Sequence, residues 1–254
     1  MPLIDETLAA EIEKITDPGA LIATLVRRFV DRAAIGTSGQ LTGVVMIDMA
    51  VKAGVKPRIF TIDTLRLFPE TYQLFDAIEK KYGIKVERIQ PEPKNLESMV
   101  RENGEFLFFD SKAKQELCCR IRKVDPNEKV LDTLDVWITG LRVDQSASRA
   151  QTKRCEIIFH GSGNGKDKRP ILKVAPLVSW TEEELRAYIK KNDVPVHKLL
   201  NYEKNGWYYE SLGCVICTTP IGPDEPRRAG RWRWFNAIDS DKECGLHKVT
   251  IDEA

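Results

Sequence analysis

Six cysteines occur from position 118 onward, in an arrangement that suggests two kinds of thiol chemistry. Cys118 and Cys119 are adjacent, whereas Cys214 and Cys217 form a CxxC. A CxxC turn lets two sulfurs bind one metal centre, and both iron and zinc sites use four thiolates at tetrahedral positions. We therefore assign these four cysteines to a metal centre, which leaves Cys244 as a candidate nucleophile.

The adjacent pair, Cys118 and Cys119, indicates which metal to expect. Structural zinc sites usually take two CxxC-like turns, whereas adjacent ligands fit better on a bulky cluster whose corners lie apart. The pattern favours a [4Fe-4S] cluster bound by Cys118, Cys119, Cys214 and Cys217. Structural zinc and buried or disulfide-bonded cysteines are the alternatives. Cys155, beside a strand-like run, is interpreted as a small packed thiol.

Basic residues follow both groups of predicted ligands. They are Arg120, Arg122, Lys123, Arg227, Arg228, Arg231 and Arg233. A thiolate-ligated cluster is negatively charged, but these seven cations exceed what it needs. Because Arg binds phosphate or sulfate oxygens in bidentate fashion, an anionic ligand next to the cluster is expected. For Arg227 and Arg233 individually, solvated surface positions are the alternative.

Cys244 has the surroundings of a reactive thiol. Lys242, His247 and Lys248 lie close to it in the sequence, and nearby positive charge favours the thiolate. The negative charge of Glu243 disfavours the thiolate, and an inert thiol is the alternative interpretation of Cys244.

Short apolar runs that alternate with helical patterns predict the elements that position these residues. Strands are expected at 33–37, 58–63, 85–88 and 136–140, and helices at 41–53, from 69, at 95–101, 111–123 and 127–133. This βαβ rhythm predicts a parallel α/β sheet flanked by helices. Pro69 and Gly83 mark the start and end of one helix, and Thr181 with Glu184 forms a capping box before another.

Two parts of the chain are expected: a nucleotide-binding α/β domain at 1–200, and an irregular segment at 201–254 that completes the cluster and carries the nucleophile. The glycine-rich run at 160–170 does not match the spacing of a phosphate loop and is interpreted as a turn between two strands. Residues 1–15 are expected to form an amphipathic helix rather than a targeting signal.

Composition excludes some partners. With 39 basic and 38 acidic side chains, no global field attracts nucleic acid or an anionic membrane, so any anion site is local. No stretch approaches the roughly 20 apolar residues of a membrane span. A cytoplasmic location, where thiols stay reduced, is therefore expected.

The chain resembles assimilatory adenylyl-sulfate reductases, in the family that includes phosphoadenylyl-sulfate reductases. The motifs that carry the resemblance are TIDTLRLFPETY at 61–72, CCRIRKVDP at 118–126, WITGLRVDQSASRA at 137–150, KVAPLVSWTEEEL at 173–185, SLGCVICTTP at 211–220, RRAGRWRW at 227–234 and KECGLH at 242–247. The resemblance implies an adenine nucleotide α-hydrolase-like fold of the PP-loop type. The four cysteines resemble the branch that holds a [4Fe-4S] cluster and uses adenosine 5′-phosphosulfate; use of the 3′-phosphorylated form is the alternative.

The resemblance also implies roles for individual residues. Cys244 corresponds to the nucleophile, Lys123 to the lysine near cluster and substrate, and Arg228 with Arg231 to the clamp on sulfate and phosphate; His247 belongs to the same catalytic set. Further substrate contacts are expected from Thr37, Ser38, Gly39, Thr42, Asp63, Thr64, Gly140 and Arg149. Two departures are visible: residues 37–43 lack the acidic positions of the family's modified pyrophosphate loop, and Leu65 replaces a usual glycine.

The activity implied is thiol-dependent reduction of the nucleotide to sulfite and AMP in sulfate assimilation. The cysteine would become S-sulfonated, and thioredoxin or glutaredoxin would then release sulfite; a dimer or tetramer is implied by relatives. One rival is a PP-loop ATP pyrophosphatase acting in thiolation, which would need an Asp and Ser pair that residues 40–43 do not supply. Another is an iron–sulfur sensor, which gives no reason for the KECGLH motif.

Overall fold

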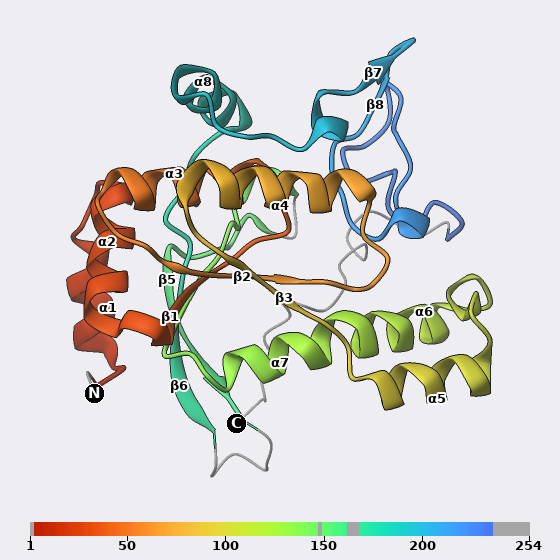
Figure 1. Ribbon diagram of the computed structural model, residues 1–254, viewed down its shortest axis with the longest axis horizontal. Coiled ribbons are helices and arrows are strands. Elements are labelled where there is room, and N and C mark those ends of the chain that lie inside the picture. The colour runs from red at the N-terminus through yellow and green to blue at the C-terminus, as the bar shows by residue number, and fades with distance from the viewer. Residues whose placement is uncertain (1–2, 147–148, 162–167, 236–254) are drawn as a thin grey trace.

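The computed structural model describes residues 3–146, 149–161 and 168–235, and its centre is a six-stranded sheet (Figure 1). The strands are β1 (Ala33–Gly36), β2 (Arg58–Ile62), β3 (Val86–Ile89), β4 (Val136–Ile138), β5 (Cys155–His160) and β6 (Arg169–Val174). Their order across the sheet is β3-β2-β1-β4-β6-β5. Neighbouring strands are parallel except β5, which pairs antiparallel with β6 at one edge. The expected parallel α/β sheet is thus confirmed, with an antiparallel strand added to it.

Helices cover both faces of this sheet. They are α1 (Glu6–Glu13), α2 (Pro18–Phe29), α3 (Leu41–Lys52), α4 (Pro69–Tyr82), α5 (Pro93–Asn103), α6 (Lys112–Cys119), α7 (Asp125–Leu131) and α8 (Glu182–Asn192). In Figure 1, α3 and α4 lie on one side of the sheet, and on the other α6 and α7 follow one another in a line with α5 beside α6. Within the described residues, no helix combines the length and apolar character that a membrane crossing needs.

Alternation along the strands builds two cores. On β1, Ala33 and Ile35 belong to the larger apolar cluster with α2 and α3, whereas Ala34 belongs to a smaller cluster with α7. Successive side chains of a strand point to opposite faces, so a four-residue strand can contribute to both cores. This double burial is why the parallel strands read as short apolar runs rather than as alternating patterns.

The helix ends follow the sequence signals closely. Pro69 is the first residue of α4, and Gly83 ends this helix in the left-handed conformation at φ +62°. Thr181 caps α8, and the reciprocal capping-box contacts with Glu184 are both present. The helix expected at 111–123 is different: α6 ends at Cys119, and Arg120–Val124 form a π-helical turn that leads into α7. Such turns occur often at functional sites.

The chain beyond residue 201 packs against the carboxyl edge of the sheet. Its described part contains two short strands, β7 (Glu203–Lys204) and β8 (Trp207–Tyr208), and one 3-10 turn, η7 (Val215–Cys217). The Leu212 amide donates to Oε1 of Gln40, and the Val215 amide donates to the carbonyl of Arg66. These contacts hold the segment next to the loops that follow β1 and β2. The division of the chain into an α/β domain at 1–200 and a catalytic segment at 201–254 stays a prediction.

Candidate active site

A cavity of about 250 Å³ lies where the parallel strands end. It is lined by residues from the loops after β1, β2 and β4, by the first turns of α3 and α8, and by the segment beyond residue 201. Ligands of open parallel sheets bind outside the carboxyl ends of the strands, so this is the expected place for a substrate. Nine predicted site residues line it: Thr37, Ser38, Thr42, Thr64, Lys123, Gly140, Arg149, Arg228 and Arg231.

The loop between β1 and α3 is built for a close turn. Gly39 has φ +75°, a left-handed conformation that favours glycine, and its amide donates to Thr37 Oγ1 at 3.1 Å. A Cβ atom on Gly43 would lie 2.9 Å from the Cβ of Thr37, so only glycine fits beneath that side chain. Gln40 precedes α3 and makes no side-chain cap, which leaves the first-turn amides of the helix facing the cavity.

Hydroxyl groups of this loop are oriented as donors toward the cavity. Each accepts a hydrogen bond from the protein: Thr37 from the Gly39 amide, Ser38 from Gln40 Nε2 at 3.1 Å, and Thr42 from Arg142 Nη1 at 2.8 Å. A hydroxyl has one proton to give, and no acceptor for these protons is found in the part of the chain that the structure describes. These hydroxyls therefore suit a ligand rich in acceptor oxygens.

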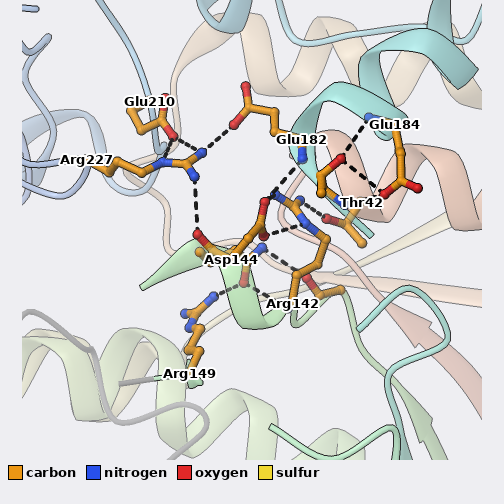
Figure 2. A network of polar contacts seen from close by, with 11 residues as sticks. Thr42, Arg142, Asp144, Arg149, Glu182, Glu184, Glu210 and Arg227 are labelled. Atoms are coloured by element: carbon orange, nitrogen blue, oxygen red, sulfur yellow. Dashed lines mark hydrogen bonds and ion pairs between the residues drawn. The ribbon is translucent and has the colours of Figure 1, made fainter. Parts of the chain in front are cut away.

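Arg142 lines the cavity and holds together the three elements that form one side of it (Figure 2). Its buried guanidinium pairs with both carboxylate oxygens of Asp144 at 2.8 and 3.0 Å while its third nitrogen reaches Thr42. Asp144 in turn accepts the amide of Glu182 at 3.1 Å, which places a negative charge at the start of α8. The turn after β4, the start of α3 and the start of α8 are thereby held together.

Arg227 is bound by two carboxylates, although 44% of its side chain is exposed (Figure 2). It pairs with Glu210 and with Glu182, and it donates to the carbonyl of Asp144 at 3.2 Å. Burial, and then the negative charge of Glu182, raise the pKa of Glu210, while Arg227 opposes the rise. Arg227 thus joins the segment beyond residue 201 to α8, and its charge is used in that contact.

Seven cations line the cavity, and three of them, Arg142, Arg186 and Arg227, pair with carboxylates. The other four are the predicted site residues Lys123, Arg149, Arg228 and Arg231. Arg231 is 5% exposed, lies over the ring of Trp232 at 4.8 Å, and donates through Nη1 to the carbonyl of Leu212 at 3.1 Å. Its buried Nε has no hydrogen-bond partner within the described ranges. An unsatisfied charged donor costs free energy unless a ligand accepts from it, so Arg231 is set to bind an anion.

The four predicted ligand cysteines come together. Cys118 and Cys119 at the end of α6, and Cys214 and Cys217 around η7, line one small pocket and are all buried. A hydrogen bond between the CxxC thiols lowers the pKa of Cys214 and raises that of Cys217. Burial raises the pKa of Cys118, against the opposing charges of Arg122 and Arg66. Cys155 lies elsewhere, on β5, where burial raises its pKa to about 11.

The walls of this pocket supply donors without protein acceptors. Arg66 Nη1, Arg122 Nε and Trp232 Nε1 are buried and, among the residues described, have no hydrogen-bond partner. Buried N–H groups around four thiols fit an iron–sulfur cluster, whose sulfurs accept such hydrogen bonds. In the described ranges, no group of three or more His, Cys, Asp and Glu side chains is arranged to hold a single metal ion.

Two predicted substrate contacts do not line the cavity. Gly39 shapes the loop from behind, and Asp63 is 3% exposed, with its carboxylate accepting from the Leu65 amide, from Tyr72 and from Gln90. Burial, and then the hydrogen bond to Asp63, raise the pKa of Tyr72 to about 12. The substrate roles of both residues stay predictions.

Two predicted catalytic residues lie outside the residues that the structure describes, and two residues that line the cavity were not predicted. Cys244 and His247 lie outside the described residues, so their places in the site stay predictions. Conversely, Arg142 and Thr71 line the cavity and were missed, because a lone Arg or Thr carries no motif of its own. The only sequence signal for Arg142 is its position inside the motif at 137–150.

The fold and this site define an α/β protein with a mostly parallel sheet and a cavity at the carboxyl ends of its strands, lined by cations and next to four buried thiols. Residues 32–220 match the family described as phosphoadenosine phosphosulfate reductase domain. The chain belongs to this family of enzymes.

Relatives cover most of the chain. An adenosine 5′-phosphosulfate reductase of Burkholderia cepacia is 35% identical over 244 residues, 96% of this chain and 90% of the relative. A probable 5′-adenylylsulfate reductase 1, chloroplastic, of Oryza sativa subsp. japonica is 38% identical over 99% of this chain, which spans only 51% of that relative. The crystal structure of a phosphoadenylyl-sulfate reductase from Candida auris, in a phosphate complex, covers 86% of this chain with a TM-score of 0.66 at 24% identity, and supports the fold alone.

Proposed function

We propose that this enzyme reduces adenosine 5′-phosphosulfate to sulfite and AMP, with electrons from a dithiol protein such as thioredoxin or glutaredoxin. One observation carries the proposal: Lys123 and Trp232 line both the cavity and the four-cysteine pocket. An anion in the cavity would therefore lie beside the thiols. The relatives named adenosine 5′-phosphosulfate reductase support this choice of substrate over its 3′-phosphorylated form.

The nucleotide end of the substrate is assigned to the loop after β1. Thr37, Ser38 and Thr42 have hydroxyl protons without protein acceptors in the described part of the chain, and the uncapped start of α3 adds amide donors. Phosphate oxygens accept from such groups and are stabilised at the amino end of a helix. The missing acidic positions of the loop leave room for this anion without like-charge repulsion.

The sulfate end is assigned to the cationic wall. Attack by a thiolate on an anionic sulfuryl group brings like charges together, so the reaction needs charge neutralisation. Lys123, Arg149, Arg228 and Arg231 line the cavity and supply it. Arg227 is excluded from this group because Glu182 and Glu210 already bind its guanidinium.

The chemical step is assigned to Cys244. Its thiolate forms a bond to the sulfur of the substrate, and the bond from that sulfur to the bridging phosphate oxygen breaks, which releases AMP and leaves a cysteine S-sulfonate. One thiolate of the dithiol protein then attacks the cysteine sulfur, sulfite leaves, and the second thiol of the donor closes its disulfide and frees Cys244. The two electrons come from the donor thiols. His247 is assigned to the protonation of Cys244 between turnovers.

Cys118, Cys119, Cys214 and Cys217 are proposed to hold a [4Fe-4S] cluster, which would supply a fixed negative charge and an electrostatic field beside the sulfate end. Lys123 balances that charge on the cavity side, and Arg66 and Arg122 do so within the pocket. We also propose that the enzyme acts in sulfate assimilation in the cytoplasm and that it assembles as a dimer or tetramer.

The test is the reaction itself, run on iron-replete protein. With adenosine 5′-phosphosulfate alone, the peptide that contains Cys244 should gain the mass of one sulfo group, and AMP should be released once per chain. Addition of reduced thioredoxin should then release sulfite. Cys244→Ser should still bind AMP but form no sulfonated peptide. Sulfite production by Cys244→Ser at the wild-type rate, or faster turnover of the 3′-phosphorylated nucleotide, would contradict the proposal.

A further inference from the structure

A buried histidine touches the cavity through a threonine. His197 is 1% exposed, and its Nε2 lies 2.9 Å from Oγ1 of Thr71, which is 3% exposed. Thr71 belongs to the first turn of α4 and lines the cavity, whereas His197 caps the 3-10 turn η6 (Lys198–Asn201) behind it. Thr71 lies in the motif at 61–72 and His197 in none of the motifs, and neither was predicted as a substrate contact.

The tautomer of His197 follows from its other nitrogen. The amide of Leu199 donates to Nδ1 at 3.2 Å, so Nδ1 has no proton. A neutral imidazole with an unprotonated Nδ1 has its proton on Nε2, and burial lowers the pKa of His197, which keeps the ring neutral. Nε2 is therefore the donor of the contact, and Thr71 Oγ1 is the acceptor.

This direction fixes what the Thr71 hydroxyl can do. Its oxygen accepts from His197, so its own proton must be given to another group. Within the described ranges, no protein acceptor receives it, although Thr71 is almost fully buried against the cavity. A buried hydroxyl proton without an acceptor is costly unless a ligand accepts it. The same arrangement holds for Thr42, whose oxygen accepts from Arg142.

We propose that His197 is a positioning residue for nucleotide binding: it holds the Thr71 hydroxyl as a hydrogen-bond donor to an acceptor atom of the bound adenylate. The inference rests on the proposed function for the identity of the ligand. Thr71 touches the ligand, and His197 acts only through Thr71. Leu67 and Leu200 also line the cavity, so the Thr71 hydroxyl is a directional donor in a lining that includes apolar side chains.

The test measures AMP affinity of the full chain by calorimetry in four proteins: wild type, Thr71→Val, His197→Asn and the double variant. Asn can accept the Leu199 amide but is too short to reach Thr71. Each single variant should weaken AMP binding about 5-fold, the effect of one neutral hydrogen bond. In the Thr71→Val background, His197→Asn should add less than about 2-fold, because the donor it positions is already absent.

Three further variants separate positioning from a loss of structure. Thr71→Ser keeps the hydroxyl, and His197→Gln keeps an amide donor at the reach of Nε2, so both should retain AMP affinity. His160→Asn is the matched control, since His160 is also buried and bonded but binds Asp132 and Glu128 on the far side of the molecule from the cavity. Its AMP affinity should equal that of wild type.

Two results would overturn the inference alone. If a chain that binds AMP loses the same affinity from His197→Asn in both backgrounds, His197 has only a structural role. If Thr71→Val leaves AMP affinity unchanged, the hydroxyl touches no ligand. This result alone overturns the inference, even if His197→Asn does not fold. A wild-type chain that binds no AMP would instead reject the proposed function, together with the inference that rests on it.

Discussion

The guanidinium of Arg231 lies directly against Gly213, in the space that a side chain at that position would occupy. A Cβ atom on Gly213 would be 2.6 Å from Cζ of Arg231, well inside van der Waals contact. Arg231 cannot move aside freely, because it is buried, donates to the Leu212 carbonyl and packs on Trp232. The glycine before the CxxC is thus a condition for the position of a cation at the cavity.

From this contact, Gly213→Ala should displace Arg231 and weaken binding of the sulfate end. A hydrogen bond to a charged group contributes about 1.5–3 kcal/mol, so KM for adenosine 5′-phosphosulfate should rise at least about 10-fold. Steady-state kinetics measure it, and thermal unfolding checks that the fold is intact. Gly222→Ala is the matched control in the same segment, because its Cβ would meet no atom closer than 3.9 Å. Equal KM values in the two variants would contradict the assignment of Arg231.

The cysteine group predicts which substitutions remove iron. Cys118→Ser replaces a ligand of the proposed cluster, so iron content per chain and the visible absorbance of the protein should fall by more than about half. Cys155→Ser is the control: this thiol is also buried, but it lies on β5 and away from the pocket of the other four. Equal iron loss in both variants, or zinc in place of iron in the wild-type protein, would contradict the cluster.

The caps and the strand order show what local patterns can predict. Thr181 with Glu184, and Pro69 with Gly83, act within one turn of helix, so the sequence alone places the ends of α4 and α8. The turn expected at 160–170 between two strands agrees with β5 and β6, but the sequence did not predict that β5 pairs antiparallel with β6 at the edge of the sheet. The helix α2 was missed although it carries local signals, since Asp17 caps it, Pro18 begins it and its buried apolar residues recur at helical spacing.

The candidate site likewise contains residues that the sequence predicts and residues that only the tertiary structure reveals. The loop at 37–43 and the four cysteines carry spacing signals, and the structure brings these residues to one edge of the sheet. Arg142 and His197 carry none, since each acts through a partner about 100 or more residues away in sequence. Asp63 has the motif but points its carboxylate into its own turn, where it supports Leu65 at φ +59°. Tertiary contacts decide these cases, and a linear pattern does not encode them.

Replacement of Asp48, which lies away from the candidate site, should cause a large loss of stability. This carboxylate is 2% exposed on α3 and accepts from the hydroxyls of Tyr82 at 3.0 Å and Tyr188 at 2.7 Å, with Lys52 at 2.8 Å. It joins α3 to α4 and α8, and Asp48→Ala would leave two half-buried hydroxyls without their acceptor. The free energy of unfolding should fall by about 2–3 kcal/mol in urea denaturation. Asp48→Asn, which keeps an acceptor oxygen, should lose less; an equal or larger loss would contradict this account.

His197 predicts a pH dependence of stability. Burial lowers the pKa of His197 from its ordinary value of 6.5, and the charge of Glu70 opposes this only in part. Below about pH 6.5 the unfolded chain therefore binds a proton that the folded chain refuses, so the free energy of unfolding falls as the pH drops toward the folded pKa. This contribution is fully present above the ordinary value and is lost in acid.

His197→Asn removes that contribution, because asparagine does not titrate. Urea denaturation of both proteins between about pH 7.5 and about pH 5 should show a steeper acid loss for wild type, and the difference between the two free energies should shrink as the pH falls. The titration of other groups is common to both proteins and cancels in this difference. Parallel curves would mean that His197 titrates alike in the folded and unfolded chain, which would contradict a pKa lowered by burial.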